Sequence, residues 1–519
     1  MDTISIVNRV AIGDMIRRSR NRFPNKAAIK EGGKTLTFKE LDEATNQFAN
    51  YLLNQGYKKG DKIATICANS WQFVVTIFGI QKAGLIWVPV NPAITPKEIE
   101  YIITNAEAKL IVLDKDFEQM TAFLDDIGLN KLYVRDEETN ENSLEAILKK
   151  ENTVEPEVEI YDRDISQIMY TSGTTGFPKG VVIQHISVYI ASLTNLIELQ
   201  GSPQDVQGIV LPFFHCAQHT LLASFLHIGA TSVIERQFDP ATFLTKIRDE
   251  KITYMTGLPM MYRLLLNLSD RKKEDTNSLR LCVYAMAPMD DRTLRKCMEE
   301  FDSDFALATG QTEIYPATAM FKPEDQLRKS GPYWGTSSMI NDTKIMDNDG
   351  NFLDKHEIGE IVHRGPNVMV EYYKNPEETI KAREHDWHHT GDLGYFDDDG
   401  LLVFVDRKKD IIKTGGENVA SIIVERALLS HQDIFNAAAV GLSHDHWIEA
   451  ITAFVVLNPG AEVTKEEIID HSKKELNHFQ VPKDVIILEK LPTTVTGKIQ
   501  KHVLRKEYEN HYSDLEKRV

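Results

Sequence analysis

The sequence predicts an α/β protein with a large N-terminal domain of layered sheets and a small α+β C-terminal domain. The chain has 519 residues, and single cores stop growing near ~250–300 residues, so two or more domains are expected. Strand-like and helix-like segments alternate through the first third and the middle, which favours mostly parallel sheets covered on both faces. Near Tyr395 this pattern gives way to a β-hairpin, which predicts a small β-rich subdomain before the C-terminal domain.

The first third contains two capping boxes, Thr37-Phe-Lys-Glu40 and Thr95-Pro-Lys-Glu98, and each predicts the start of a helix. After the first box, apolar residues recur at helical spacing as far as Leu52, and Gly56 predicts the end of that helix. The other elements expected here are strands at 62–67, 85–90 and 110–113 and a helix at 71–83.

Further strands are expected at 232–235, 252–255 and 280–284. Two apolar runs flank the segment 396–400, which predicts a β-hairpin turned at Asp399-Gly400. The charged segment Asp406-Arg-Lys-Lys-Asp410 follows at once, and we place the domain boundary there, between residues 1–408 and 409–519. The C-terminal domain is expected to contain strands at 450–457 and 485–488 and a helix at 465–476.

Composition and charge exclude several classes of protein. The net charge of -18 repels nucleic acid and anionic lipid, so no nucleic-acid partner is expected. Gln81, Lys82 and two glycines interrupt the most apolar stretch, 71–90, so stable membrane insertion is not expected either. The four cysteines form no Cys-x-x-Cys pair, and the N-terminus lacks a signal-peptide pattern, which together predict a cytoplasmic protein with free thiols. Oligomeric state is left open, with a homodimer as one alternative.

The most informative segment is Tyr170-Thr-Ser-Gly-Thr-Thr-Gly-Phe-Pro-Lys-Gly180. Glycines allow close approach of the backbone to a ligand, and successive N–H groups in such a turn form an anion-binding nest. Hydroxyl groups and one lysine complete a site that suits a polyphosphate, although the same composition is also found in flexible polar loops. The candidate phosphate-binding residues are Thr171, Ser172, Gly173, Thr174, Thr175, Gly176 and Lys179.

This segment closely resembles the signature loop of the adenylate-forming superfamily, which contains acyl-CoA synthetases, peptide-synthetase adenylation domains and beetle luciferases. The resemblance implies that the loop holds the β- and γ-phosphates of ATP. Further along, Thr309-Gly-Gln-Thr-Glu313 resembles a second motif of that family. It implies that Glu313, together with Thr174, holds Mg²⁺ and that Gln311 and Thr312 contact the nucleotide. Thr309 departs from the family, which usually has an aromatic residue there to stack on adenine.

Two more segments follow in the order of the family. His389-Thr-Gly-Asp392 implies that Asp392 accepts hydrogen bonds from both ribose hydroxyls, since a carboxylate offers two acceptors to a vicinal diol. The segment 406–419 resembles the inter-domain motif, and by itself its charge run is typical of a solvated surface. The resemblance implies that Arg407 reaches the nucleotide and that Lys409 is the hinge of a mobile C-terminal domain. It also implies that Gly415, Gly416 and Glu417 line a CoA tunnel.

The last match is Leu491-Pro-Thr-Thr-Val-Thr-Gly-Lys-Ile-Gln-Lys501, which implies that Lys498 is the catalytic lysine. A flexible ammonium there can bridge the substrate carboxylate and the α-phosphate. Weaker matches place His215 in the acyl site, with a catalytic role, and Met286 and Ala287 in the acyl pocket. Met286 replaces a usual glycine and is expected to narrow that pocket.

Together the motifs imply an AMP-forming acyl-CoA synthetase that uses ATP, Mg²⁺ and CoA with a small-molecule carboxylic acid. Apolar segments at 213–228 and 258–268 favour a medium- to long-chain fatty acid, with an aryl or carnitine-type acid as the alternative. A stand-alone adenylation enzyme that loads a carrier-protein thiol is the second enzyme hypothesis, and a luciferase-like oxygenase is a third. A nucleotide-binding sensor without turnover is the non-enzyme hypothesis, and it rests only on Thr309 and Met286.

Overall fold

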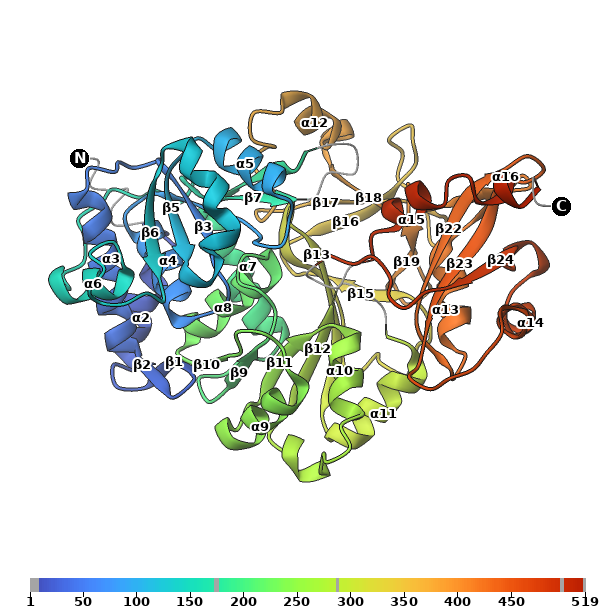
Figure 1. Cartoon of the computed structure of the whole chain (residues 1–519), viewed down its shortest axis with the longest axis horizontal. Coiled ribbons are helices and arrows are strands. Elements are labelled where there is room, and N and C mark those ends of the chain that lie inside the picture. The colour runs from blue at the N-terminus through green and yellow to red at the C-terminus, as the bar shows by residue number, and fades with distance from the viewer. Residues whose placement is uncertain (1–8, 172–176, 286–288, 495–498, 517–519) are drawn as a thin grey trace.

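Three β-sheets organise the protein in the computed structural model, which describes residues 9–171, 177–285, 289–494 and 499–516 (Figure 1). A six-stranded and a thirteen-stranded sheet belong to the N-terminal part, and a five-stranded sheet belongs to the C-terminal part. The predicted α/β fold, with one large and one small domain, is thereby confirmed. The boundary between residues 408 and 409 stays a prediction.

The six-stranded sheet has the order β6-β5-β3-β4-β7-β8 and is parallel except for the pair β7–β8. Side chains alternate between its faces, as β-geometry requires: Ile63 packs toward α3 and α4, whereas Ala64 packs toward α5. Helices therefore cover both faces, as predicted. The elements are β3 (Lys62–Ile66), β4 (Ile86–Pro89), β5 (Ala108–Asp114), β6 (Asn130–Val134), β7 (Ile165–Thr171), β8 (Lys179–Gln184), α3 (Phe38–Asn54), α4 (Trp71–Lys82), α5 (Pro96–Asn105) and α6 (Leu144–Lys150).

The thirteen-stranded sheet has the order β16-β17-β18-β19-β15-β14-β13-β12-β11-β9-β10-β1-β2. Its strands are parallel from β1 to β13 along this order, and antiparallel from β13 to β16. The strands are β1 (Ala27–Glu31), β2 (Lys34–Thr37), β9 (Val206–Ile209), β10 (Thr231–Ile234), β11 (Tyr254–Gly257), β12 (Leu281–Ala285), β13 (Asp304–Gln311), β14 (Ile314–Phe321), β15 (Tyr333–Ser337), β16 (Asp342–Met346), β17 (Gly359–Arg364), β18 (His388–Phe396) and β19 (Leu402–Arg407).

Helix α8 is almost completely enclosed, because nearly all of its side chains are buried. Apolar residues occur all around it, which is typical of a helix packed on every side. It contacts α2, α7, β10 and β14. The helices of this region are α2 (Asp14–Arg22), α7 (His185–Glu198), α8 (Cys216–Ile228), α9 (Pro240–Glu250), α10 (Pro259–Leu266), α11 (Asp291–Phe301) and α12 (Pro376–Lys381).

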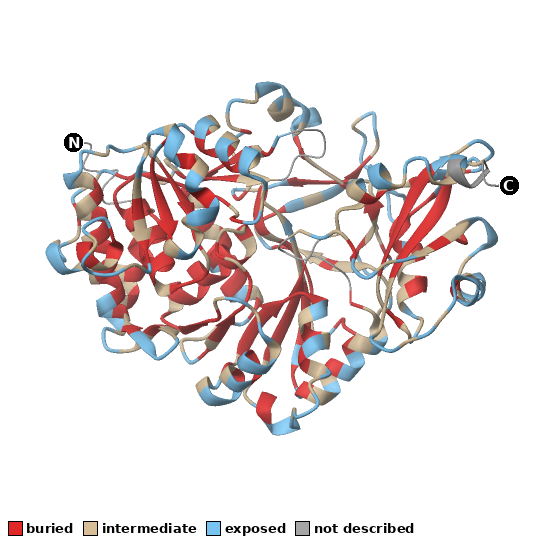
Figure 2. Ribbon diagram, viewed as in Figure 1, coloured by how far each residue is buried: buried red, intermediate tan, exposed pale blue. Residues whose placement is uncertain are grey.

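The C-terminal sheet is built on a long hairpin of β22 and β23, whose strands are largely buried (Figure 2). Helix α13 packs on one face of this hairpin through Leu428, and α15 packs on the other through Leu504. The elements are β20 (Ile412–Thr414), β21 (Glu417–Val419), β22 (Ile434–His444), β23 (Ile448–Leu457), β24 (Asp484–Ile487), α13 (Ser421–Leu429), α14 (Lys465–Glu475), α15 (Lys501–Glu507) and α16 (His511–Glu516).

Buried charges fix the segment that joins the two parts. Asp406, at the end of β19, accepts hydrogen bonds from the backbone N–H and from the hydroxyl of Ser421, the latter over 2.6 Å. Lys501 contacts the same hydroxyl and pairs with Glu425 at 2.8 Å. Asp410 accepts a 2.8 Å hydrogen bond from Arg505. The chain between β19 and α13 is therefore tied to both α13 and α15.

Most of the expected elements are present, with ends that differ slightly. Both capping boxes form, at Thr37 and at Thr95, and the hairpin turns at 397–401 with Gly400 at φ +76°. The strand expected at 252–255 lies instead at Tyr254–Gly257. None of the helices in the described part of the chain has the length and apolar character that a bilayer crossing requires. All four cysteines are buried free thiols.

Candidate active site

A buried carboxylate, Asp392, is held between an amide and a guanidinium where the antiparallel strands meet. Gln311, the last residue of β13, donates through its side-chain amide to Asp392 Oδ2 over 2.7 Å and to the carbonyl oxygen of Thr390 over 3.0 Å. Asp392 and Arg407 are cross-strand partners in β18 and β19, and Arg407 Nε lies 3.6 Å from Asp392 Oδ1. The structure thus brings together three residues that the sequence motifs place far apart.

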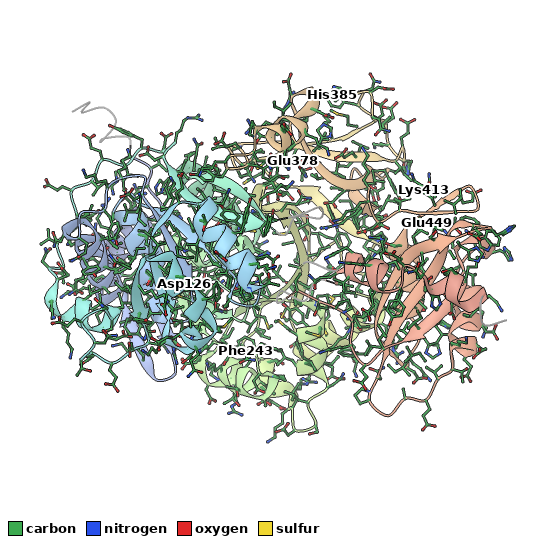
Figure 3. The ribbon with its side chains drawn as sticks, turned by 45° about the horizontal axis from the view of Figure 1, so that its top comes forward. Asp126, Phe243, Glu378, His385, Lys413 and Glu449 are labelled. Carbon is green, nitrogen blue, oxygen red and sulfur yellow. The ribbon has the colours of Figure 1, made fainter. Side chains whose placement is uncertain are left out.

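A second group forms immediately after Gln311. Glu313 Oε1 accepts a 2.9 Å hydrogen bond from the hydroxyl of Tyr372. The ammonium of Lys179 lies 4.2 Å from the centre of the same tyrosine ring and 3.0 Å from Glu378 Oε2 on α12 (Figure 3 labels Glu378). The hydrogen bond from Lys179 lowers the pKa of Glu378. Tyr372 therefore connects the candidate metal ligand Glu313 to the candidate phosphate-binding lysine.

Thr312 links this region to the start of α8. Its hydroxyl oxygen lies 3.5 Å from Cys216 Sγ, and Cys216 follows His215, the N-cap of α8. His215 Nδ1 accepts a 3.3 Å hydrogen bond from the backbone N–H of Ala217, so a neutral His215 carries its proton on Nε2. Burial raises the pKa of the Cys216 thiol to about 12, which keeps it neutral. His215 and Thr312 thus lie on either side of one buried thiol.

Lys409, the residue expected at the hinge, lies two positions after Arg407 and within electrostatic reach of Arg407 and Asp392, and the residues expected at the CoA tunnel follow further along the chain. Lys409 and Glu417 are exposed. Gly415 and Gly416 have φ values of +58° and +89°, in the left-handed region that favours glycine. Gly415 donates its N–H to the carbonyl oxygen of Trp447 over 2.8 Å, and a Cβ there would lie 2.9 Å from Trp447 Cε3. Within the described ranges, no hydrogen bond or ion pair joins residues 415–417 to Glu313 or to Asp392.

Several candidate residues lie outside the described residues, and their roles stay predictions: Ser172, Gly173, Thr174, Thr175, Gly176, Met286, Ala287 and Lys498. The two ends of the phosphate loop are described. Thr171 ends β7, Lys179 begins β8, and the two residues are antiparallel partners. The hydroxyl of Thr171 also lies 3.5 Å from the carbonyl oxygen of Lys179. The loop between them is therefore anchored on a two-stranded ladder, whose Lys179 end lies next to Tyr372.

The donor set around Glu313 fits one kind of metal site. Among the described residues, no group of three His, Cys, Asp or Glu side chains has metal-binding geometry. Mg²⁺ is commonly bound by one or two carboxylates together with substrate phosphates. The carboxylate of Glu313, close to Lys179 and half-buried, fits that type of site.

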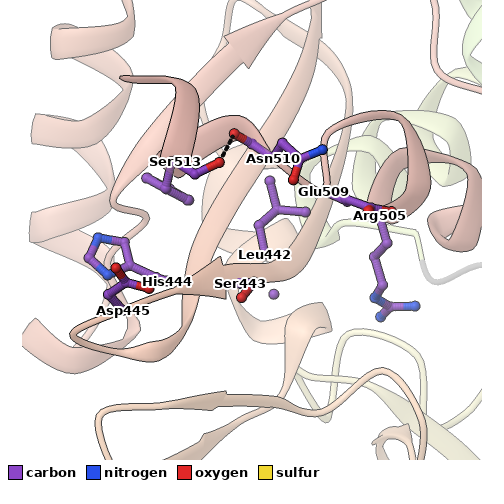
Figure 4. Close-up of a pocket in the computed structure, with 10 residues that line it drawn as sticks. Leu442, Ser443, His444, Asp445, Arg505, Glu509, Asn510 and Ser513 are labelled. Carbon is purple, nitrogen blue, oxygen red and sulfur yellow. Dashed lines mark hydrogen bonds between the residues drawn. The ribbon is translucent and has the colours of Figure 1, made fainter. Parts of the chain in front are cut away.

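Two surface cavities lie away from these residues. One, of about 410 Å³, is on the C-terminal part and is polar, with His444, Asp445, Arg505 and Glu509 in its wall (Figure 4). The other, of about 650 Å³, lies at the amino end of strands β12 and β13, whereas Gln311 lies at the carboxyl end of β13. Neither cavity is lined by the groups around Asp392 or Glu313.

Sequence reasoning missed Tyr372 and Glu378. Tyr372 is 59 positions from Glu313, and Glu378 is 199 positions from Lys179, so only the folded chain brings these pairs together. A single tyrosine in a sequence usually indicates packing. The paired tyrosines at 372 and 373 carry no local signal that separates the inward-facing one from the outward-facing one.

Comparisons with known proteins identify the family of this chain. Residues 16–373 match the family model described as AMP-binding enzyme, and residues 423–498 match the AMP-binding enzyme C-terminal domain. The chain is 30% identical to 4-hydroxybutyrate–CoA ligase 2 of Metallosphaera sedula, over 95% of this chain and 93% of that protein. It is also 30% identical to a long-chain-fatty-acid–CoA ligase of Mycobacterium tuberculosis, over 96% of this chain and 98% of that protein.

Among solved structures, ATP-bound MatB from Rhodopseudomonas palustris superimposes with a TM-score of 0.88 at 27% identity. The match covers 96% of this chain and 99% of that chain. The resemblance that the motifs imply is thereby confirmed over nearly the whole sequence. The chain belongs to the AMP-binding enzyme family and is an AMP-forming acid–thiol ligase.

Proposed function

We propose that this ligase activates a medium- to long-chain fatty acid with ATP and transfers the acyl group to CoA. One observation supports the proposal: Gln311, the last residue of β13, and Glu313, two positions later, each contact a different group of candidate residues. Gln311 orients Asp392, which suits a ribose diol. Glu313 is joined through Tyr372 to Lys179, which suits a polyphosphate with its metal ion.

In the first step, a carboxylate oxygen of the acid attacks the α-phosphorus, and the bond to the β-phosphate oxygen breaks. Asp392 holds the ribose, and Arg407 beside it contacts the nucleotide. Lys179 and the loop 171–176 hold the leaving pyrophosphate, and Lys498 bridges the acid and the α-phosphate. Glu313 and Thr174 would hold a magnesium ion, which would neutralise charge on the phosphate oxygens. Fixed charges of this kind stabilise the transition state more than the ground state.

In the second step, the C-terminal domain turns about Lys409 and brings Gly415, Gly416 and Glu417 to the adenylate. The CoA thiol loses its proton, its sulfur attacks the acyl carbon, and AMP leaves. The two glycines form the two-residue turn between β20 and β21 with left-handed φ values, so the turn presents backbone without side chains, which supports this role. Such domain closure around a hinge is a common way of completing a catalytic site.

The acid is the least constrained part of the proposal. The apolar segment 213–228, which favours an alkyl chain, lies largely on α8, where Leu222 and Phe225 are buried. The relative from M. tuberculosis acts on long-chain fatty acids according to its name, whereas the relative from M. sedula acts on 4-hydroxybutyrate. Aryl and short hydroxy acids are therefore the alternatives to test. The expected cytoplasmic location stays a prediction.

ATP–pyrophosphate exchange with a panel of carboxylic acids tests the proposal. We expect exchange to be fastest with fatty acids of medium to long chain, and AMP release to begin when CoA is added. Exchange without AMP release on adding CoA would favour a carrier-protein thiol as acceptor. No exchange with any acid would favour a nucleotide sensor. A K498A variant should lose exchange but still form the thioester from supplied acyl-adenylate.

A further inference from the structure

We propose that Tyr372 is a positioning residue for the nucleotide site, whose hydroxyl fixes the carboxylate of Glu313 and whose ring fixes the ammonium of Lys179. The inference rests on the proposed function, because it assigns a third residue to the same metal and phosphate site. One side chain would thereby hold two groups of opposite charge. The hydroxyl of the tyrosine contacts the carboxylate, and its ring contacts the ammonium.

The role of the hydroxyl rests on its hydrogen bond from the buried Tyr372 to the half-buried Glu313. Tyr372 is 6% exposed, and its hydroxyl donates to Glu313 Oε1 over 2.9 Å. Burial and then the adjacent carboxylate raise the pKa of this phenol far above its usual range, so the hydroxyl remains a donor. A hydrogen bond to one oxygen orients the carboxylate and leaves the other oxygen for a cation. Outer partners of this kind orient metal ligands in many metal sites.

The role of the ring rests on its contact with Lys179. The lysine ammonium lies 4.2 Å from the ring centre, within the range of a cation–π interaction. Glu378 Oε2 holds the same ammonium at 3.0 Å, so an incoming phosphate has to compete with this carboxylate. A phosphate does not have to displace the ring, because the ring face attracts the cation and leaves the three N–H donors of Lys179 available. Tyr372 thus keeps Lys179 in place while its anionic partner changes.

The backbone holds Tyr372 in position for both tasks. Its N–H donates to the hydroxyl of Thr379 over 2.9 Å, next to Glu378 on α12. A β-bridge joins Tyr372 to Val181 in β8, the strand that begins with Lys179. Glu313 is tied to the same segment, since its carbonyl oxygen accepts from the N–H of Met369 over 2.8 Å. The tyrosine is therefore fixed to both of the elements that carry its charged partners.

Packing alone would not require the hydroxyl, because a phenylalanine would fill the same space. The variants Y372F and Y372L therefore separate the two roles. Tyr373 offers a matched control: it is the next residue, and its hydroxyl donates to the exposed Glu107 over 3.1 Å, outside the site. ATP binding is measured by isothermal titration calorimetry without any carboxylic acid, so that no turnover occurs. Each protein is titrated once in EDTA and once in excess Mg²⁺.

We expect Y372F to bind ATP in Mg²⁺ about ten-fold more weakly than wild type, since a hydrogen bond to a charged group is lost. In EDTA its affinity should stay within about two-fold, because the ring still holds Lys179. Y372L should also bind ATP about three- to five-fold more weakly in EDTA, because the cation–π contact with Lys179 is gone. Y373F should match wild type under both conditions. In an E313Q background, Y372F should weaken ATP binding in Mg²⁺ by less than about a further two-fold, the size expected when both changes act on one contact.

Equal losses for Y372F in EDTA and in Mg²⁺ would mean a general disturbance of the fold and would overturn the proposal. Wild-type affinity of Y372F in Mg²⁺ would overturn it as well. Additive effects of Y372F and E313Q would show that the hydroxyl does not act through Glu313. These outcomes leave the proposed function intact as long as wild type binds ATP. Failure of wild type to bind ATP under either condition would overturn the proposed function and this inference together.

Discussion

Mild acid is expected to destabilise this protein steeply, because it buries five histidines as neutral imidazoles. Burial lowers their pKa from 6.5 to about 4 in His185, His227 and His363, and to about 3 in His219 and His388. In the unfolded chain each imidazole takes up a proton below its ordinary pKa. The unfolded state therefore binds more protons than the folded state, and stability is lost as the pH falls from about 7 toward the folded pKa values.

His388 allows the size of this effect to be isolated. It lies opposite His363 on β17 and β18, and within the described chain neither of its ring nitrogens has a hydrogen-bond partner. Burial is the main cause that lowers the pKa of His388, the neighbouring His363, His389 and Arg383 lower it further, and only Glu360 acts to raise it. Between pH 7.5 and 5.5, a histidine with these pKa values costs about 1.4 kcal/mol of folding free energy. Five such residues would cost about 7 kcal/mol if they act independently.

The assay is urea unfolding followed by tryptophan fluorescence at pH 7.5 and 5.5, on wild type and on H388L. The variant is expected to be at least as stable as wild type at pH 7.5, since it removes a buried polar ring without partners. Its loss of stability on acidification should be smaller than that of wild type by about 1.4 kcal/mol. The control is H478Q, which changes an exposed histidine and should keep the wild-type loss. An unchanged pH dependence in H388L would refute the reasoning.

Three other substitutions test separate features. Ile448 is a β-branched residue at φ +67° with 67% exposure, so I448G should stabilise the protein by about 0.5–1 kcal/mol, seen as a higher melting temperature. D392N should raise the KM for ATP in pyrophosphate exchange by about ten-fold or more, because the amide that replaces the charged acceptor binds the diol less well and opposes Gln311; an unchanged KM would contradict the ribose role. G415A places a Cβ 2.9 Å from Trp447 Cε3, so thioester formation should slow while pyrophosphate exchange stays near wild type; equal losses in both would argue against a tunnel role.

Local signals in the sequence were sufficient for most elements. The capping boxes at Thr37 and Thr95 start helices because their side chains satisfy backbone N–H groups that no helical bond can reach. The strand near residue 254 shows the limit of such reasoning. Ile252 is fully buried, but its N–H donates to the carbonyl oxygen of Ile247 and closes α9 instead of joining the sheet. The apolar character of Ile252 predicted its burial correctly but predicted its membership of a strand incorrectly. Both a strand and the end of a helix can bury an isoleucine.

The sequence motifs pointed to the charged candidate residues of the site but not to the side-chain contacts that join them. Motif order along the chain selects Glu313, Asp392 and Arg407 as candidates, and the fold brings the last two together as cross-strand partners. Nothing in the sequence indicated that Tyr372 would join Glu313 to Lys179. That contact depends on the path of the segment 366–375 beside β8, and tertiary packing of this kind leaves no periodic trace in the sequence.

The position of β20 has a consequence for chain cleavage. This short strand follows the joining segment at once, yet it lies inside the C-terminal sheet, between β21 and β23. A protease cut at Gly415-Gly416 would leave β20 on the large fragment while its neighbours belong to the small one. The contacts of Asp406 with Ser421 and of Asp410 with Arg505 would also span the cut. The nicked protein should therefore run as one species in gel filtration and separate into two pieces only on denaturation.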